Sequence, residues 1–262
     1  NYNLERPLYL HQENAIRKVK DGKNIIVSTG TGSGKTESFL IPILNELIEE
    51  HKINKLKSGV RAMVLYPMNA LASDQLKRLK ELLKNYPEIT FGSYTGEVLQ
   101  SYKEALESYR NMYGEDPLPN ELISREQIKD NPPHILITNY SMLEYLLLRP
   151  KDSILFNKET WKYIVIDEAH MYTGAKAIEI GMLLRRLKNK IVGNKNIKFI
   201  LTSASLGRGI EDNPEIVNFA EKLTDEKFYE EDIITGITDP PLLNPKNEVS
   251  LSEYIKIYNK KK

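Results

Sequence analysis

The chain has 262 residues, of which 40% are hydrophobic and 28% charged, enough apolar material for one large domain or two small ones. Lysine and arginine (37) nearly balance aspartate and glutamate (36), so the net charge of +1 excludes a protein that holds nucleic acid through a globally basic surface. The absence of cysteine excludes disulfides and thiolate metal sites and fits a reducing compartment, so we expect a cytoplasmic protein.

No apolar stretch is long enough to span a membrane, and the start carries no signal-peptide pattern, so no membrane partner is expected. The first residue is Asn rather than Met, and the last residues are "YNKKK". Both features suggest a segment of something longer.

Short runs of β-branched and apolar residues recur along the chain, and turn residues and a helical pattern follow each run. Most of the runs lack polar alternation, as strands buried on both faces do. This rhythm predicts an α/β fold with a doubly wound, mostly parallel sheet, in which ligands bind at the carboxyl ends of the strands. The runs are "NIIVS" (24–28), "RAMVLYP" (61–67), "ITFGSY" (89–94), "HILITN" (134–139), "YIVIDE" (163–168) and "KFILTSA" (198–204).

Two regions break the rhythm. The segment 97–133 is charged and rich in tyrosine, and we interpret it as an insertion on the rim of the domain. From about 223 onward the strand–helix pattern stops, which predicts one domain over 1–222 and a linker or the start of a following module over 223–262. Three tyrosines of the insertion could stack on bases, although their spacing favours one buried helix face: Tyr102, Tyr109 and Tyr113.

The stretch "STGTGSGKT" joins the first run to a helical pattern, which is the context that a phosphate-binding loop needs. Its glycines let backbone N–H groups close around phosphate oxygens at a helix N-terminus. Lys35 would reach the β- and γ-phosphates, and the Thr36 hydroxyl would ligate Mg²⁺. A strict motif has glycine at position 29, so a glycine-rich turn without a ligand stays open for this loop alone. The ATP contacts predicted here are Thr29, Gly30, Thr31, Gly32, Ser33, Gly34, Lys35 and Thr36.

A second half of the site follows the fifth run, where "YIVIDEAH" ends on two carboxylates. Asp167 at a strand tip can hold Mg²⁺ through its hydration shell. Glu168 can polarise the attacking water as a general base. The alternative is that this acidic pair is only a solvated helix start. That alternative becomes less favoured because a Gly-Lys-Thr loop follows an earlier strand. The predicted catalytic residues are Lys35, Asp167 and Glu168.

The phosphate loop and the "DEAH" stretch together resemble the superfamily 2 helicases, specifically the first of their two RecA-like motor domains. Other family motifs follow in order along residues 8–210: "LYLHQENAI", "LYPMNALASDQ", "SYTGE", "ILITNYSML" and "LTSASLG". The resemblance implies a RecA-like phosphate-loop NTPase with ATP and Mg²⁺ as cofactors. It also implies that Gln12 reads the adenine edge.

Three of these stretches resemble motifs Ia, Ib and Ic, which lie at strand ends. Their small polar side chains and helix N-termini suit contacts to the phosphate backbone, which need no strongly basic domain. Ordinary loop and cap chemistry is the alternative for each stretch taken singly. Asn139 stands where the family commonly has proline. The nucleic-acid contacts implied are Pro67, Asn69, Thr95, Gly96, Thr138 and Asn139.

"LTSASLG" resembles motif III, with Ser205 in place of the usual threonine, a change that keeps the hydroxyl. By the resemblance, His170, Ser203 and Ser205 couple the nucleotide site to the strand-binding face through hydrogen bonds. His170 could equally be a plain helix-start residue.

Longer stretches, such as "PPHILITNYSMLEYLLLRP" and "GAKAIEIGMLLRRLK", resemble DEAH-box helicases with a C-terminal module of unknown function. That group includes MrfA-type DNA-repair helicases and the large helicases of anti-phage systems. The resemblance implies the ATP-binding motor half of a DNA helicase or translocase in DNA repair or phage defence. An RNA-dependent ATPase stays open, because backbone contacts alone do not expose 2′-OH discrimination. A nucleotide-sensing scaffold is a third alternative.

After "LTSASLG" the sequence contains no further strand–helix series and no stretch resembling motif VI. Motors of this type hydrolyse ATP between two RecA-like domains, and the second domain contributes an arginine finger. We therefore expect a second RecA-like domain as partner. The chain alone is expected to bind ATP·Mg²⁺, and single- or double-stranded nucleic acid weakly, with DNA favoured and with little or no turnover.

Overall fold

A single sheet of eight strands, all parallel, runs through the computed structural model, which describes residues 8–30, 32–191, 197–204 and 210–236. The spatial order is β4-β3-β5-β2-β6-β7-β1-β8. The strands are β1 (Ile25–Ser28), β2 (Ala62–Tyr66), β3 (Phe91–Tyr94), β4 (Glu121–Leu122), β5 (Ile135–Asn139), β6 (Tyr163–Ile166), β7 (Lys198–Ser203) and β8 (Ile233–Thr235). The predicted fold class, a doubly wound parallel sheet, is confirmed, and all six predicted runs form strands.

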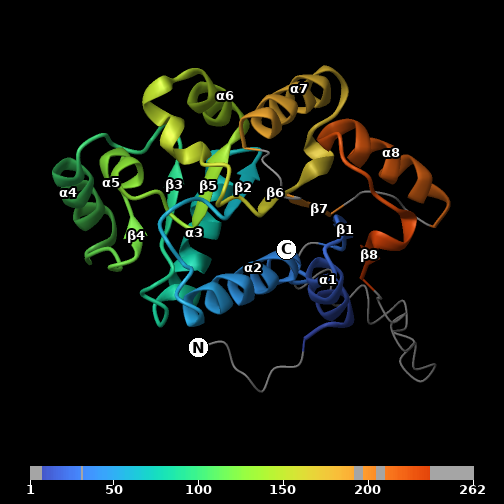
Figure 1. Ribbon diagram of the computed structural model, residues 1–262, viewed down its shortest axis with the longest axis horizontal. Helices are drawn as coiled ribbons and strands as arrows, with labels where there is room; N and C mark the ends of the chain where they lie inside the picture. The colour runs from blue at the N-terminus through green and yellow to red at the C-terminus, as the bar shows by residue number, and fades with distance from the viewer. Residues whose placement is uncertain (1–7, 31, 192–196, 205–209, 237–262) are drawn as a thin grey trace, which may run out of the picture.

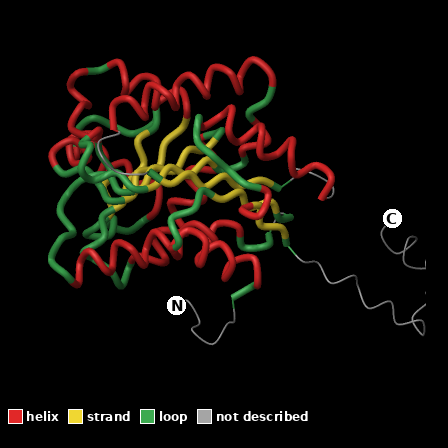
Figure 2. The backbone as a smooth tube through the Cα atoms, turned by 45° about the vertical axis from the view of Figure 1, so that its right-hand side comes forward, coloured by secondary structure: helices red, strands yellow, loops and turns green. Residues whose placement is uncertain are grey.

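Helices cover both faces of the sheet, which lies between two helical layers in Figure 2. The first layer contains α1 (Leu10–Lys20), α2 (Lys35–Lys52) and α3 (Asn69–Leu83). The second contains α6 (Tyr140–Leu148), α7 (Gly174–Ile191) and α8 (Asn213–Thr224), which lie above the sheet in Figure 1. Short 3₁₀ helices are η1 (Pro150–Phe156), η2 (Ala169–Met171), η3 (Ile210–Asp212) and η4 (Glu230–Asp232).

Neighbouring residues of each strand enter different cores, because successive side chains of a strand point to opposite faces. On β2, Met63 and Leu65 pack under the α6–α7 layer, whereas Ala62 and Val64 pack against α1, α2 and α3. This double burial explains why the strands read as continuous apolar runs. Among the described helices, none is both long and apolar enough to cross a membrane.

The edges of the sheet differ from the sequence expectation. The segment 97–133 forms α4 (Tyr102–Tyr113), β4 and α5 (Arg125–Asp130), and β4 extends the sheet beside β3. At the other edge, β8 pairs with β1, with Val27 opposite Ile234. The boundary predicted at 222 falls inside α8, and the sheet continues past it. Strands of two and three residues are too short to give a periodic pattern.

The tyrosines of α4 do not form the buried helix face that their spacing favoured. Tyr102 and Tyr113 are 42% and 44% exposed, and Ala105 is the buried residue of this helix. Tyr109 is half-buried because its hydroxyl donates to Glu121 Oε2 (3.0 Å) and accepts from Lys80 Nζ (2.6 Å). Polar contacts of Tyr109 with Lys80 of α3 and Glu121 of β4 therefore help to hold α4 against the edge of the sheet.

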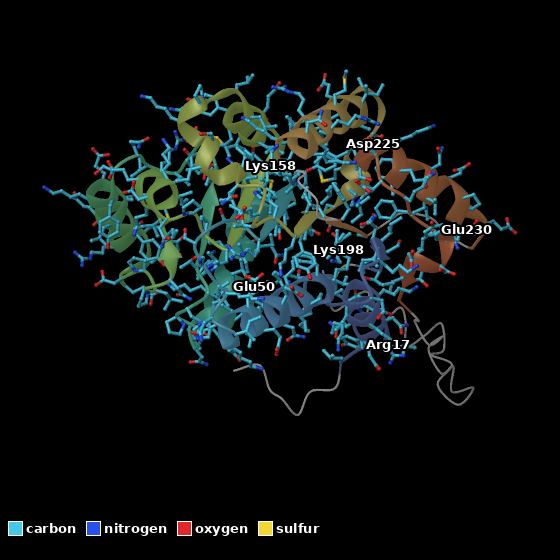
Figure 3. The ribbon with its side chains drawn as sticks, in the orientation of Figure 1. Arg17, Glu50, Lys158, Lys198, Asp225 and Glu230 are labelled. Carbon is cyan, nitrogen blue, oxygen red and sulfur yellow. The ribbon has the colours of Figure 1, made fainter. Side chains whose placement is uncertain are left out.

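A cluster of charges closes the amino-terminal edge of the sheet, opposite the predicted ligand edge. Glu50, labelled on α2 in Figure 3, accepts from Arg61 Nε at 3.0 Å and lies 2.5 Å from Lys162 Nζ. Lys162 also pairs with Glu46. Since Arg61 and Lys162 directly precede β2 and β6, this cluster fixes where α2 crosses the strands.

His134, just before β5, lies buried beside this cluster in its neutral form. Its Nδ1 accepts from the backbone N–H of Thr90 (2.9 Å), which leaves Nε2 to donate to the Lys57 carbonyl oxygen (3.2 Å). Burial, followed by the charge of Arg61, lowers the pKa of His134 to about 4. Protonation would therefore break a backbone contact in the folded state.

We expect acid to destabilise the fold through His134. Since its pKa is lower in the folded state, the unfolded chain binds the extra proton first. Stability from this residue is complete above about pH 6.5 and falls by about 3 kcal/mol as the pH drops to about 4. His134→Gln should flatten this part of the stability–pH curve, measured by urea unfolding. His51→Gln, at the exposed end of α2, is the control. Equal slopes in His134→Gln and the unchanged protein would contradict the assignment.

Candidate nucleotide site and strand-binding face

The phosphate loop connects β1 to α2 at the carboxyl edge of the sheet. Gly34, the N-cap residue directly before α2, has φ at 82°, a left-handed conformation that favours glycine. A Cβ there would lie 2.3 Å from Gln12 Nε2, because that amide donates to the Gly34 carbonyl oxygen at 3.0 Å. Gln12 Oε1 accepts from the backbone N–H of Tyr9 at 2.9 Å. Gln12 therefore ties α1 to the loop.

Lys35 points back into the loop. Its Nζ donates to the Thr29 carbonyl oxygen at 3.1 Å and lies 3.7 Å from Glu168 Oε1. The hydroxyls of Thr29 and Ser33 are 2.6 Å apart and close the loop from the side. Gly30 and Gly32 have open space where a Cβ would stand. Thr31, also predicted here, lies outside the described residues.

The acidic pair follows β6, two strands from β1 in the sheet. Asp167 is 7% exposed, and its Oδ1 accepts a hydrogen bond from the Thr202 hydroxyl. Burial raises the pKa of Asp167, the charge of Glu168 raises it further, and the Thr202 hydrogen bond lowers it. A cation beside Asp167 would therefore favour the ionised carboxylate.

Glu168 adopts a left-handed backbone (φ 49°), which directs its carboxylate between two partners. One is Lys35, and the other is His170, whose Nδ1 lies 3.3 Å from Glu168 Oε2. His170 Nδ1 is also 3.0 Å from the Ser203 hydroxyl. The structure thus brings together two of the three predicted coupling residues, His170 and Ser203, whereas Ser205 lies outside the described residues.

The sequence reasoning missed Thr202, the residue before Ser203. Its hydroxyl donates to Asp167 and accepts from the Glu168 backbone N–H at 3.3 Å. The sheet register places Leu201 beside Ile166, so Thr202 meets Asp167 directly. A signal existed in the sequence, since "LTSAS" and "VIDEA" each end a buried strand on hydroxyl or carboxylate groups.

The donor set fits Mg²⁺ held together with phosphates. Mg²⁺ prefers oxygen ligands and commonly takes only one or two protein groups beside phosphates and waters. Thr36 and Asp167 offer such oxygens. Within the described ranges there is no group of three or more His, Cys, Asp or Glu side chains that could hold a metal unaided. Thr36 Oγ1 currently accepts from Arg78 NH1 at 2.8 Å.

A chain of polar side chains crosses the carboxyl ends of three neighbouring strands, β3, β5 and β2. Asn139 Nδ2 donates to Asn69 Oδ1 at 2.5 Å, and Asn69 Nδ2 donates to Glu97 Oε1 at 2.9 Å. Asn139 Oδ1 accepts from the Met142 backbone N–H (2.7 Å) and so caps α6. The three stretches that are predicted to contact nucleic acid therefore meet on one face of the domain.

The six residues predicted to contact nucleic acid differ in their exposure. Asn69 and Asn139 are half-buried, and Gly96 is exposed. The Thr138 hydroxyl is fully buried and donates to the Tyr94 carbonyl oxygen at 2.7 Å, so it supports the strand end from inside. Pro67 and Thr95 are buried as well.

Arg125 was also missed by the sequence reasoning. It comes from the rim insertion, and its NH2 donates to the carbonyl oxygens of Thr95 and Gly96, both at 3.3 Å. Its guanidinium carbon lies 5.5 Å from the centre of the Tyr94 ring. The insertion therefore braces one of the three predicted strand-binding stretches.

A parallel sheet with a phosphate loop after β1 and an acidic pair after β6 defines a RecA-like nucleotide-binding domain. The family model described as DEAD/DEAH box helicase matches residues 9–213, and the chain belongs to this family. The predicted family resemblance is thereby confirmed.

Two curated relatives resemble much of this chain. Druantia protein DruE of Escherichia coli (strain UMEA 4076-1) is 32% identical over 311 residues, covering 84% of this chain and 17% of DruE. The ATP-dependent helicase hrq1 of Schizosaccharomyces pombe (strain 972 / ATCC 24843) is 28% identical over 257 residues, covering 94% of this chain and 21% of hrq1. The chain thus spans about a fifth of the length of these relatives.

Among solved structures, the DUF1998 helicase MrfA aligns with a TM-score of 0.66 and 28% identity, over 99% of this chain and 35% of that one. A second MrfA structure, bound to DNA and AMPPNP, aligns with a TM-score of 0.62 and 25% identity, over 96% of this chain and 32% of that one. The predicted similarity to MrfA-type helicases is therefore confirmed.

Proposed function

We propose that this chain is the ATP-binding motor half of a nucleic-acid-dependent ATPase, a DNA helicase or translocase acting in DNA repair or phage defence. One observation carries the proposal: Lys35 of the phosphate loop meets Glu168 of the acidic pair at 3.7 Å. This contact joins the two halves of a phosphoryl-transfer site. The asparagine chain that would contact a strand lies at the same edge of the sheet.

Each residue of the nucleotide site would have a separate role in binding or hydrolysing ATP. Lys35 would bind the β- and γ-phosphates in place of its contacts with Thr29 and Glu168, and the Glu168 carboxylate would then be free to accept a proton from the attacking water. Thr36 and Asp167 would hold Mg²⁺, which when bound would supply positive charge that stabilises the phosphate oxygens. Gln12 remains a proposed adenine contact, which would require its amide to leave Gly34 or Tyr9.

The face that is proposed to bind nucleic acid would respond to the state of the nucleotide site. The His170 Nδ1 lies within hydrogen-bond distance of the Ser203 hydroxyl (3.0 Å) and 3.3 Å from Glu168 Oε2, so His170 stands between the acidic pair and β7. Asn69, Gly96 and Asn139 would meet the phosphate backbone. DNA is favoured over RNA because the similar MrfA structure is bound to DNA. The second RecA-like domain, which would supply the arginine finger, is the proposed partner.

The test compares binding with turnover. The chain should bind a fluorescent ATP analogue, and Lys35→Ala should weaken binding, whereas Lys52→Ala at the exposed end of the same helix should not. Hydrolysis should need the second domain and rise more with single-stranded DNA than with RNA of equal length. Strong nucleic-acid-stimulated hydrolysis by this chain alone would contradict the proposal. Stimulation by RNA alone would favour the RNA-dependent alternative.

A further inference from the structure

Arg78 lies in the middle of α3 and reaches across to the first turn of α2. Its NH1 donates to Thr36 Oγ1 at 2.8 Å, and its NH2 donates to Glu37 Oε1 at 2.9 Å. The two terminal nitrogens of one guanidinium therefore hold two successive residues of the phosphate-loop helix. The Arg78 side chain is 47% exposed, so solvent rather than packing surrounds much of the arm.

The contact occupies the oxygen that the motif assigns to Mg²⁺. Mg²⁺ binds oxygen ligands at about 2.0–2.1 Å, so an ion on Thr36 Oγ1 would lie at most about 5 Å from the Arg78 nitrogen. The ion carries two positive charges and the guanidinium one. Like charges this close repel, and the Thr36 hydroxyl cannot serve both groups on equal terms.

The charge of Arg78 and the charges of the acidic pair act on one common neighbour. Tyr66, the buried last residue of β2, has its pKa raised by burial and by the charges of Asp167 and Glu168. The charge of Arg78 lowers the same pKa. Tyr66 therefore lies within electrostatic range of both Arg78 and the acidic pair.

We propose that Arg78 is a positioning residue that gates the magnesium site. In this structure its guanidinium holds the Thr36 hydroxyl, and the arm would have to leave Thr36 for Mg²⁺ to bind there with the phosphates. Glu37 gives the arm a place to remain after release, because it binds the other nitrogen. This proposal rests on the proposed function, since it concerns the metal of the same nucleotide site.

Arg78 lies on α3, the helix that also contributes to the proposed nucleic-acid-binding face. α3 begins at Asn69, which contacts Asn139 and Glu97 on the proposed nucleic-acid face. Arg78 follows nine positions later on the same helix, about 13 Å along its axis. A rigid shift of α3 on strand binding would therefore move the arm at the metal site.

The experiment titrates Mg²⁺ against the full chain in the presence of a fluorescent ATP analogue and records binding. Arg78→Gln should lower the Mg²⁺ concentration for half-maximal binding by roughly tenfold, the effect expected for removing one charge about 5 Å from a divalent ion in screened water. Lys77→Gln is the matched control, because it removes a charge from the adjacent, 65% exposed side chain. Its Mg²⁺ requirement should stay unchanged.

Binding without Mg²⁺, measured in EDTA, separates the explanations. If Arg78→Gln changes the affinity for the analogue in EDTA by the same factor, Arg78 contacts the nucleotide and the gate is refuted. An equal or higher Mg²⁺ requirement in Arg78→Gln also refutes it, while the proposed function stands. If the unchanged chain binds no analogue at any Mg²⁺ concentration, the proposed function fails. Arg78→Met, which keeps an unbranched apolar stem without the charge, must repeat the result, and circular dichroism checks the fold of both variants.

Discussion

Glu168→Gln is expected to leave nucleotide binding within a few-fold of the unchanged protein and to lower ATP hydrolysis by the complete helicase by about 10²–10⁴-fold, the usual contribution of a general base. The glutamine keeps the size of the side chain, but its amide cannot accept the proton of the attacking water. It also removes the ionic contact to Lys35 (3.7 Å) and changes the group that lies 3.3 Å from His170 Nδ1. The variant should therefore retain bound ATP instead of releasing products.

The measurements are steady-state phosphate release and the lifetime of bound, labelled ATP. Glu179→Gln, on the exposed side of α7, provides a matched control with the same chemical change away from the site. Turnover within tenfold of the unchanged protein would show that another group accepts the proton. Unchanged function of Glu168→Gln in the cell would favour the scaffold alternative over a motor.

The long elements of this fold could be predicted from the sequence, and the short ones could not. β2 is a five-residue apolar run, and β5 begins with three apolar residues; both are buried along nearly their whole length, so their composition alone marks them. β4 and β8 have two and three residues, and each exists because a neighbour offers an open edge. Such pairing depends on tertiary contacts rather than on a local pattern, which is why 223–262 was interpreted as starting a separate segment.

At the site, motifs identified the groups that would touch phosphate or metal, but not the groups that hold them. Thr202 donates a hydrogen bond to Asp167, Arg78 donates to Thr36, and Arg125 donates to the Thr95 carbonyl oxygen. In each pair the two residues are 30 to 42 positions apart in the sequence. Spacing in the sequence carries no information about such contacts. The side chains of Thr95 and Thr138, predicted to contact nucleic acid, are both buried, and the Thr138 hydroxyl donates to the Tyr94 carbonyl oxygen; the predicted contact of these two residues stays a prediction.

The position of β2 explains how one edge can serve two ligands. β2 lies between β6, which ends on the acidic pair, and β5, which ends on Asn139. The helix after β2 begins with Asn69 on the strand-binding face and carries Arg78 to the phosphate-loop helix. A displacement of β2 and α3 would therefore change contacts at both the nucleotide site and the proposed nucleic-acid-binding face.

Thr202→Val is expected to weaken Mg²⁺-dependent nucleotide binding by about 10–100-fold, the usual cost of losing a partner that orients a metal ligand. Valine has nearly the same shape, so the fully buried site stays filled. The Asp167 carboxylate loses its hydroxyl donor, and the Glu168 N–H loses its acceptor. Without that donor the pKa of Asp167 should rise further, and the metal must compete with a proton.

The control for Thr202→Val is Thr224→Val, because Thr224 is equally buried and its hydroxyl donates within α8 to the Ala220 carbonyl oxygen at 2.8 Å. Both variants should lose about 1–2 kcal/mol of unfolding free energy, since each removes one buried hydrogen-bonding hydroxyl. Only Thr202→Val should shift the Mg²⁺ titration, and Thr202→Ser should restore it. If both valine variants shift it equally, the effect reflects general loss of stability, and Thr202 has no special part in holding Asp167.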